Sequence, residues 1–331
     1  MLKTKTTIRS VLRLGVGELV EIRSREEILR TLDGRGTLDA IPFMPEMLKF
    51  AGKRYRVFKR VDKVCGSFEA KGFGFRRMEN AVLLEGLRCD GGSHGGCQAS
   101  CMILWKEAWL RRVSSRQAAK SDVDGTSLVP CESRCTETTL NEGTRKAVGP
   151  EDIGEETFIC QATELKNGSS PLACWDMIQY LRDIRSGNVS VWQVVRGLLI
   201  AIFNAFQQFR NGVTYPYLPH GELRKTPGGT SDLRVGEIVE VKSKEEIWQT
   251  LNSRNRNRGL LFDVEMLKFC GRRFDVRGSV RKIIDGRTGK MLNFPNDCVV
   301  LEGVTCGGDY HQFCPMSEYI YWREIWLRKV T

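Results

Sequence analysis

Two segments of the chain, 15–113 and 233–331, are copies of one sequence. The run Glu46-Met-Leu-Lys-Phe50 recurs unchanged as Glu265-Met-Leu-Lys-Phe269. The copies align at one constant offset through the first half of each segment and lose two residues before the second half. A period this long indicates two duplicated domains, because solenoids repeat every few tens of residues. The duplication therefore predicts that whatever one copy folds into, the other adopts as well.

Each copy contains a loop with cysteine, histidine and cysteine in the same spacing. The residues are Cys89, His94 and Cys97 in the first copy and Cys306, His311 and Cys314 in the second. Two of the three histidines in the chain thus occupy equivalent positions. A thiolate, an imidazole and a second thiolate at this spacing can reach one ion, because the intervening glycines let the backbone turn tightly. The pattern predicts metal binding, with zinc as the first expectation.

The fourth ligand that structural zinc requires differs between the copies. The first copy offers Cys101 or Cys65, whereas the second has Glu318 in place of Cys101. Three interpretations of the second copy stay open. It borrows a ligand such as Asp309, Cys298 or Cys270; its residues only pack; or it keeps an open position for water or substrate, as catalytic zinc does. Without a metal, the cysteines of both copies are free thiols.

A further group of cysteines lies in the polar segment 114–174 between the copies. Its members are Cys131, Cys135, Cys160 and Cys174. Four thiolates suit zinc, and iron–sulfur clusters use the same ligands, so an iron–sulfur cluster is the alternative. A polar segment of this length cannot order itself by burying apolar surface, and metal binding supplies folding free energy in such cases.

The order of elements predicts an α+β fold in which two β-rich copies flank a helical hairpin. Each copy begins with a short strand, followed by a Ser-x-x-Glu capping box that opens a helix. The predicted parts are a basic tail at 1–14, the first copy at 15–113, a linker at 114–174, a helical hairpin at 175–212 and the second copy at 233–331. The hairpin's second helix, opened by Ser190-x-x-Gln193, is apolar around most of its circumference and is predicted to be buried between the copies.

The first strands are Val16-Gly-Glu-Leu-Val-Glu-Ile22 and Val235-Gly-Glu-Ile-Val-Glu-Val241. Both resemble the first strand of SH3-like barrels. This resemblance implies a small twisted β-barrel in each copy. Farther along, residues 54–61 alternate with period two, which predicts a strand with Val57 inward and Arg54, Arg56 and Arg60 outward.

The chain carries 51 lysine and arginine residues against 40 acidic ones, a net charge of +11. The excess of positive charge lies on the two copies and the tail, and it favours anionic partners such as nucleic acid or acidic protein. The predicted anion-binding residues are Lys53, Arg54, Arg56, Lys59, Arg60, Arg272 and Arg273. The alternative is a solvated edge strand whose charges discourage aggregation.

Each copy also carries two tryptophans four positions apart, with a glutamate midway between them. These are Trp105 and Trp109 in the first copy and Trp322 and Trp326 in the second. With their basic neighbours they suit stacking on nucleic-acid bases. Aromatic pairs that recur in a duplicated domain more often build its hydrophobic core, which is the favoured interpretation.

No stretch approaches the roughly 20 apolar residues of a membrane-spanning helix, and the start lacks an apolar signal sequence, so we expect a cytoplasmic protein. The sequence predicts a metal-stabilised tandem-repeat binding or scaffold protein with an anionic macromolecule or a protein as partner. The alternative is a metalloenzyme, or a zinc or iron–sulfur redox protein, with its site where the copies and the hairpin meet. Whether the chain is an enzyme, and whether it takes a small-molecule substrate, stays open.

Overall fold

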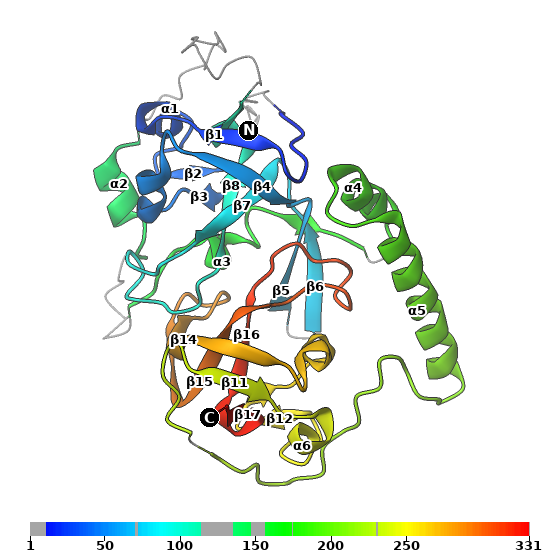
Figure 1. Cartoon of the computed structure of the whole chain (residues 1–331). Helices are drawn as coiled ribbons and strands as arrows, with labels where there is room; N and C mark the ends of the chain where they lie inside the picture. Colours follow the sequence, from blue (N-terminus) through cyan, green and yellow to red (C-terminus); the bar gives the residue numbers. More distant parts are fainter. Residues whose placement is uncertain are drawn as a thin grey trace. The chain divides into compact units, whose positions relative to one another are not determined.

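The structure, a computed structural model, describes residues 11–69, 72–113, 135–146, 156–173, 175–229 and 231–330. The chain divides into two compact units. The first comprises 1–97, 101–189 and 284–291, and the second comprises 98–100, 190–283 and 292–331. Helices and strands are mixed and the sheets curl in the manner of a half-barrel, so the predicted α+β class is confirmed at that level (Figure 1). The predicted domain limits stay predictions.

The first unit is built on a five-stranded antiparallel sheet with the strand order β8-β7-β4-β1-β9. Its strands are β1 (Leu19–Ile22), β4 (Arg54–Arg60), β7 (Ala81–Arg88), β8 (Met102–Lys106) and β9 (Leu110–Arg112). Val20 and Ile22 are fully buried while Leu19 and Glu21 are not, which is the alternation of a strand with one face on a core. The sheet thus forms where the period-two pattern predicts it.

The strand β4 departs from its sequence pattern at a β-bulge. Val57 pairs with Leu84, but Lys59 pairs with Leu83, so the register against β7 shifts between them. An extra residue at a bulge reverses which side chains face the core. As a result the Arg60 side chain is only 13% exposed, and the prediction that it faces solvent is wrong. β4 also lies between β7 and β1, so it is not the edge strand considered above.

The tryptophans of the first copy form the centre of its core. Trp105 and Trp109 are fully buried, and Phe43 packs edge-on against Trp109 with ring centroids 5.1 Å apart. The Trp109 indole donates a hydrogen bond of 3.1 Å to the Thr31 hydroxyl. The core interpretation of this pair is therefore confirmed, and the pair is not available for stacking on bases.

Short elements surround this sheet. They are α1 (Arg25–Leu29), β2 (Thr37–Leu38), β3 (Ile41–Pro42), the 3₁₀ helix η1 (Pro45–Phe50), β5 (Lys63–Glu69), β6 (Gly72–Arg77), the 3₁₀ helix η2 (Glu107–Trp109), α2 (Glu137–Glu142), α3 (Gln161–Glu164), β10 (Ser170–Pro171) and α4 (Ile178–Ser186). The predicted capping box is present, because Ser24 accepts from the Glu27 amide at 3.3 Å and Glu27 accepts from the Ser24 amide at 2.9 Å. Local hydrogen bonding thus begins α1 at the expected residue.

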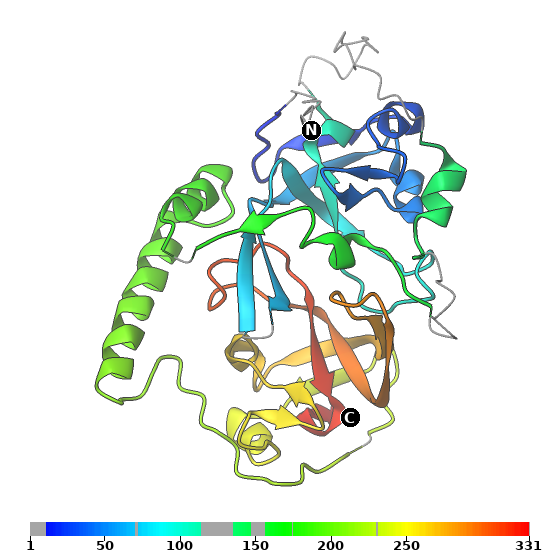
Figure 2. The same ribbon diagram turned by 180° about the vertical axis from the view of Figure 1, so that it is seen from behind.

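The second unit repeats this strand order as β16-β15-β14-β11-β17, drawn in yellow to red in Figure 2. Its elements are α5 (Val191–Phe209), β11 (Ile238–Val241), α6 (Lys244–Trp248), β12 (Arg256–Asn257), β13 (Leu260–Leu261), the 3₁₀ helix η3 (Val264–Phe269), β14 (Arg273–Ile284), β15 (Met291–Thr305), β16 (Tyr319–Arg323), the 3₁₀ helix η4 (Glu324–Trp326) and β17 (Leu327–Lys329). Trp322 and Trp326 are fully buried, with ring centroids 6.5 Å apart. The second tryptophan pair therefore also builds a core.

Both helices of the predicted hairpin are present. Gly187, in the left-handed conformation at φ 79°, ends α4, and the capping box of Ser190 and Gln193 begins α5. α4 belongs to the first unit and α5 to the second, and on α5 the side chains of Trp192, Ile202 and Phe209 are exposed. Of the helices that the structure describes, none has the length and hydropathy that crossing a membrane requires.

Candidate metal centre

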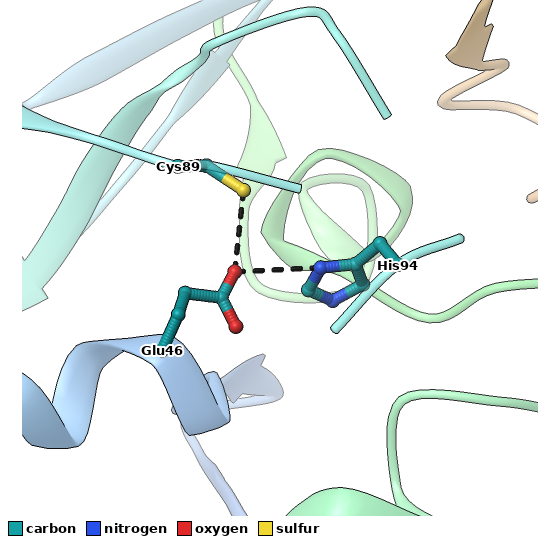
Figure 3. Close-up of side chains that lie close together, drawn as sticks. All are labelled: Glu46, Cys89 and His94. Atoms are coloured by element: carbon teal, nitrogen blue, oxygen red, sulfur yellow. Dashed lines mark hydrogen bonds and ion pairs between the residues drawn. The ribbon is translucent and has the colours of Figure 1, made fainter. Parts of the chain in front are cut away.

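The first unit brings a glutamate, a cysteine and a histidine together. One ligand atom from each of Glu46, Cys89 and His94 lies within 4.8 Å of the other two. Glu46 comes from η1, where Pro45 opens the turn and the neighbouring Met47 and Leu48 are buried in the core. Figure 3 shows its carboxylate reaching toward the thiol and the imidazole, which come from the loop after β7. The helix thus supplies an acidic ligand to the Cys/His loop.

The loop that carries Cys89 and His94 closes on itself through backbone hydrogen bonds. The Cys89 amide donates to the Cys101 carbonyl at 2.9 Å, and the Gly91 carbonyl accepts from the His94 amide at 3.0 Å. Gly91 has φ 72°, and a Cβ there would lie 2.0 Å from the Cys97 carbonyl oxygen. Only glycine fits this position, because any side chain would collide with backbone that cannot move aside. The tight turn that Gly91 allows therefore brings His94 close to Glu46.

The three side chains are close and almost completely shielded from water. The Cys89 thiol donates to Glu46 Oε1 at 3.2 Å, and His94 Nδ1 lies 3.4 Å from the same oxygen (Figure 3). The His94 side chain is 1% exposed and that of Glu46 is 5% exposed. Sulfur, nitrogen and oxygen atoms therefore converge on one small buried volume.

Several polar atoms of this group lack hydrogen-bond partners. Within the described part of the chain, neither ring nitrogen of His94 makes a hydrogen bond, and neither does Glu46 Oε2. Buried polar groups in folded proteins are paired in the great majority of cases, and leaving one unpaired costs about 1–3 kcal/mol. His94 Nε2 and Glu46 Oε2 thus have no partner among the described residues, and His94 Nδ1 has the Glu46 carboxylate at 3.4 Å. An ion between these buried, convergent atoms would satisfy them.

Burial and neighbouring groups set the pKa values of the two acidic side chains, Glu46 and Cys89. Burial favours a raised pKa for Glu46, but its interactions with His94, with its own backbone amide and with Cys89 outweigh burial, so the pKa is lowered. Burial raises the pKa of the Cys89 thiol, and the neighbouring Glu46 carboxylate raises it further. The thiol is therefore neutral at pH 7 unless a cation replaces its proton, as metal binding does.

The second unit holds the equivalent group, Glu265, Cys306 and His311, again with ligand atoms within 4.8 Å of one another. Its loop is closed in the same way, with the Gly308 carbonyl accepting from the His311 amide at 3.0 Å. Cys306 Sγ lies 3.6 Å from His311 Nδ1. Here, however, the polar atoms have partners from the protein itself.

Protein groups satisfy this second cluster. Glu265 accepts from the Tyr310 amide at 2.6 Å and from Lys268 Nζ at 3.3 Å. His311 Nε2 lies 3.5 Å from Asp263, and the interactions with Asp263 and Cys306 raise the pKa of His311 to about 10. Lysine and histidine therefore pair with the carboxylates around the second group, whereas Glu46 of the first group contacts Cys89 and His94.

The structure changes the membership of the predicted sites. Each group gains a glutamate that the sequence argument missed, although the identical Glu-Met-Leu-Lys-Phe runs were visible signals for both. Neither group, as found among the described residues, includes the second loop cysteine or the proposed fourth ligands. These are Cys65, Cys97, Cys101, Cys270, Cys298, Asp309 and Cys314. Of the linker cysteines, Cys135 and Cys160 are buried, while Cys131 and Cys174 lie outside the described residues.

Several of the predicted anion-binding cations are paired with acids of the same unit. Arg54 contacts Glu21, and Arg273 contacts Glu240. Arg60 contacts the buried Glu107 and Asp62. The side chains of Lys53, Arg56 and Arg272 are exposed, and Lys59 is half-buried. Lys53 and Arg56 in the first unit and Arg272 in the second are thus exposed and have no acidic partner among the described residues.

The ten cysteines in the described part of the chain are free thiols. No known protein family matches the chain, and no curated protein or solved structure is significantly similar to it. What the protein does must therefore be argued from its own geometry.

Proposed function

We propose that the first unit binds zinc through Glu46, Cys89 and His94, and that the metal stabilises a tandem binding module. The observation that carries the proposal is the fully buried His94, whose two ring nitrogens make no hydrogen bond among the described residues. Zinc accepts sulfur, nitrogen and carboxylate oxygen in one tetrahedral shell. Iron–sulfur clusters are held mainly by thiolates, so this mixed set favours zinc over the iron–sulfur alternative.

Metal analysis of the full-length chain tests the proposal. After removal of loosely bound metal, we expect close to one zinc per chain at the first site. His94→Asn should abolish that zinc. His220→Asn is the matched control, because His220 is exposed and belongs to neither group. Wild-type protein that binds no zinc, or a His94 variant that keeps it, would contradict the proposal.

The proposed partner of the binding module is an anionic macromolecule. The net charge of +11 supports this, together with the exposed cations Lys53, Arg56 and Arg272. We expect retention on heparin that weakens as salt is raised, since phosphate-like contacts release counterions. The triple variant Lys53→Gln, Arg56→Gln, Arg272→Gln should elute at lower salt than Arg54→Gln, whose guanidinium is already paired. If the two variants elute at the same salt concentration, Lys53, Arg56 and Arg272 do not contact the anion.

A second candidate function, a metal-dependent enzyme, is favoured by one observation in the second unit. A cavity of about 370 Å³ is lined by Lys268, Asp309 and Tyr310, and two of these residues contact Glu265 of the Cys306–His311 group. A three-ligand site beside a cavity is how catalytic zinc is arranged. Azide added to the cobalt-loaded protein should change its visible spectrum if a coordination position is open, and Cys306→Ser should remove that change. An unchanged wild-type spectrum would contradict an open coordination position and therefore the proposed metal-dependent enzyme.

A further inference from the structure

The cavity of about 370 Å³ in the second unit is formed by four segments that lie apart in the sequence. These are α5, the turn at Tyr215 and Pro216, η3, and the loop 309–313. The volume falls within the range of about 300–1,000 Å³ that small-molecule sites occupy. The cavity is therefore large enough for a small molecule, and it shares no residue with the proposed zinc site.

α5 is held on the other walls of this cavity at two positions. Gly197 lies so close to the loop that a Cβ there would be 2.7 Å from Phe313 Cζ. The Asn204 side chain donates to the Tyr215 carbonyl and accepts from the Tyr215 amide, each at 2.7 Å. Specific contacts within one unit thus bring the helix, the turn and the loop around the same space.

Among the described residues, three charged side chains line the cavity, and one of them has no partner of opposite charge. Lys268 Nζ lies 3.2 Å from Asp309 and 3.3 Å from Glu265, so acidic groups already compensate its charge. Arg196 is exposed and makes no ion pair in the described part of the chain. α5 itself contains no acidic residue. The Arg196 guanidinium is therefore the group of this cavity that is available to an anion.

Much of the remaining wall is apolar, with Ile200 from α5, Leu267 from η3 and Phe313 from the loop. Small-molecule sites combine such walls with a few polar groups that orient the ligand. Arginine holds a carboxylate through two parallel hydrogen bonds. One uncompensated cation matches a carboxylate, which carries one negative charge, better than a phosphate monoester, which carries about 1.5–2 at pH 7.

We propose that this cavity binds a small organic acid, with its carboxylate on Arg196 and its apolar body against Ile200 and Leu267. The inference goes beyond the zinc proposal, because the cavity belongs to the second unit and its binding residues are not metal ligands. It requires no metal at the Cys306–His311 group. A metal-dependent enzyme in this unit would act on such an acid, since Lys268 both lines the cavity and contacts Glu265 of that group.

Methyl NMR of the full-length chain tests the inference, with 3-phenylpropionate as the probe and a chelator present. We expect the signals of Ile200 and Leu267 to shift as the acid is added, and those of Ile22 and Leu32, in the core of the first unit, to stay unchanged. The uncharged 3-phenylpropanamide should bind about tenfold or more weakly, which is the contribution of a hydrogen bond to a charged group. Phenyl phosphate should also bind more weakly than the acid.

Two arginine variants assign the carboxylate to its partner. Arg196→Gln should weaken binding of the acid by about tenfold or more and leave binding of the amide unchanged. Arg210→Gln is the matched control, because it removes the same charge just after α5 from a side chain that does not line the cavity. It should bind the acid as the wild type does.

The outcomes that contradict the inference are distinct. If the Ile200 and Leu267 signals do not shift, the cavity is not a site for the acid. Equal affinities for acid and amide, or an Arg196→Gln variant that binds the acid as well as the wild type, would show that Arg196 does not hold the carboxylate. Tighter binding of phenyl phosphate would overturn the choice of a carboxylate. Because the chelator removes metal, none of these results depends on the zinc proposal for the first unit.

Discussion

The two copies allow a prediction in which equivalent substitutions have opposite effects. In the first unit the double variant Glu46→Leu, His94→Leu removes three buried polar atoms that make no hydrogen bond among the described residues. At about 1–3 kcal/mol each, these atoms cost the metal-free protein roughly 3 kcal/mol or more. The attraction between Glu46 and His94 returns part of this, and repacking costs up to about 1.5 kcal/mol. We therefore expect the metal-free variant to be about 1–3 kcal/mol more stable than the metal-free wild type.

The matched variant Glu265→Leu, His311→Leu should do the reverse. It leaves Asp263 without its imidazole and Lys268 without one of its two carboxylates, so we expect a loss of at least about 2 kcal/mol. Removing one partner of a charged pair is costly, whereas removing unpaired polar atoms is not.

Urea unfolding in the presence of a chelator measures both variants, and hydrogen exchange in β7 and β15 assigns each change to its unit. Added zinc should stabilise the wild type by about 2.7 kcal/mol at a free concentration 100 times the Kd, and should not stabilise the Glu46/His94 variant. If that variant instead loses stability in chelator as much as the second-unit variant does, the first cluster is an ordinary buried network and the metal proposal loses its foundation.

Three further outcomes follow from the described contacts. Glu107→Gln should cost about 3 kcal/mol in urea unfolding, because it breaks the buried pair with Arg60. Glu324→Gln replaces the equivalent carboxylate of the second unit, which accepts from the Ser231 amide among the described residues, and should cost under about 1 kcal/mol. Equal costs would contradict this difference. Gly91→Ala should abolish zinc retention, while Gly52→Ala, with nothing within 4 Å of its Cβ, should cost only about 1 kcal/mol of backbone strain. The pKa of His311 is raised from 6.5 to about 10, so its protonated side chain stabilises the metal-free fold fully below pH 6.5. The stability advantage of wild type over His311→Leu should therefore shrink as the pH rises from 6.5 to 10, and it should not change between pH 5 and 6.

Local features of the fold could be predicted from the sequence because they depend on neighbouring residues. The capping box at Ser24 and the left-handed Gly187 are fixed by hydrogen bonds and backbone freedom within one turn, and both occur where expected. The bulge at Val57 to Lys59 could not be predicted in this way. It exists only in the pairing of β4 with a distant strand, so the alternating sequence gave the wrong direction for Arg60.

The sequence also predicted only part of the candidate site, because its residues come from distant parts of the chain. Spacing identified Cys89 and His94, because both lie in one loop, but it favoured Cys97 over Glu46 as their companion. Glu46 is 43 residues from Cys89 along the chain, and only the packing of η1 against the loop brings them together. The identical runs at Glu46 and Glu265 indicate duplication, but they do not indicate which distant loop their glutamates approach.

The two matching Glu/Cys/His groups support the proposed function most directly. Two loops with equivalent backbone hydrogen bonds each place a cysteine and a histidine beside a glutamate, Glu46 or Glu265. The backbone of the loops therefore does not explain why the polar atoms of one group have protein partners and several of the other do not.

The difference lies in the neighbours of each group. Asp263, where the first copy has Met44, faces His311, and Lys268 contacts Glu265, whereas the equivalent Lys49 contacts Asp90. Phe158 packs against the loop of the first group at Gly95. Charged partners make a metal unnecessary for the stability of the second group. Phe158 offers His94 no polar partner, and a bound ion would satisfy the imidazole, which favours the first unit over the second as the site of the proposed metal.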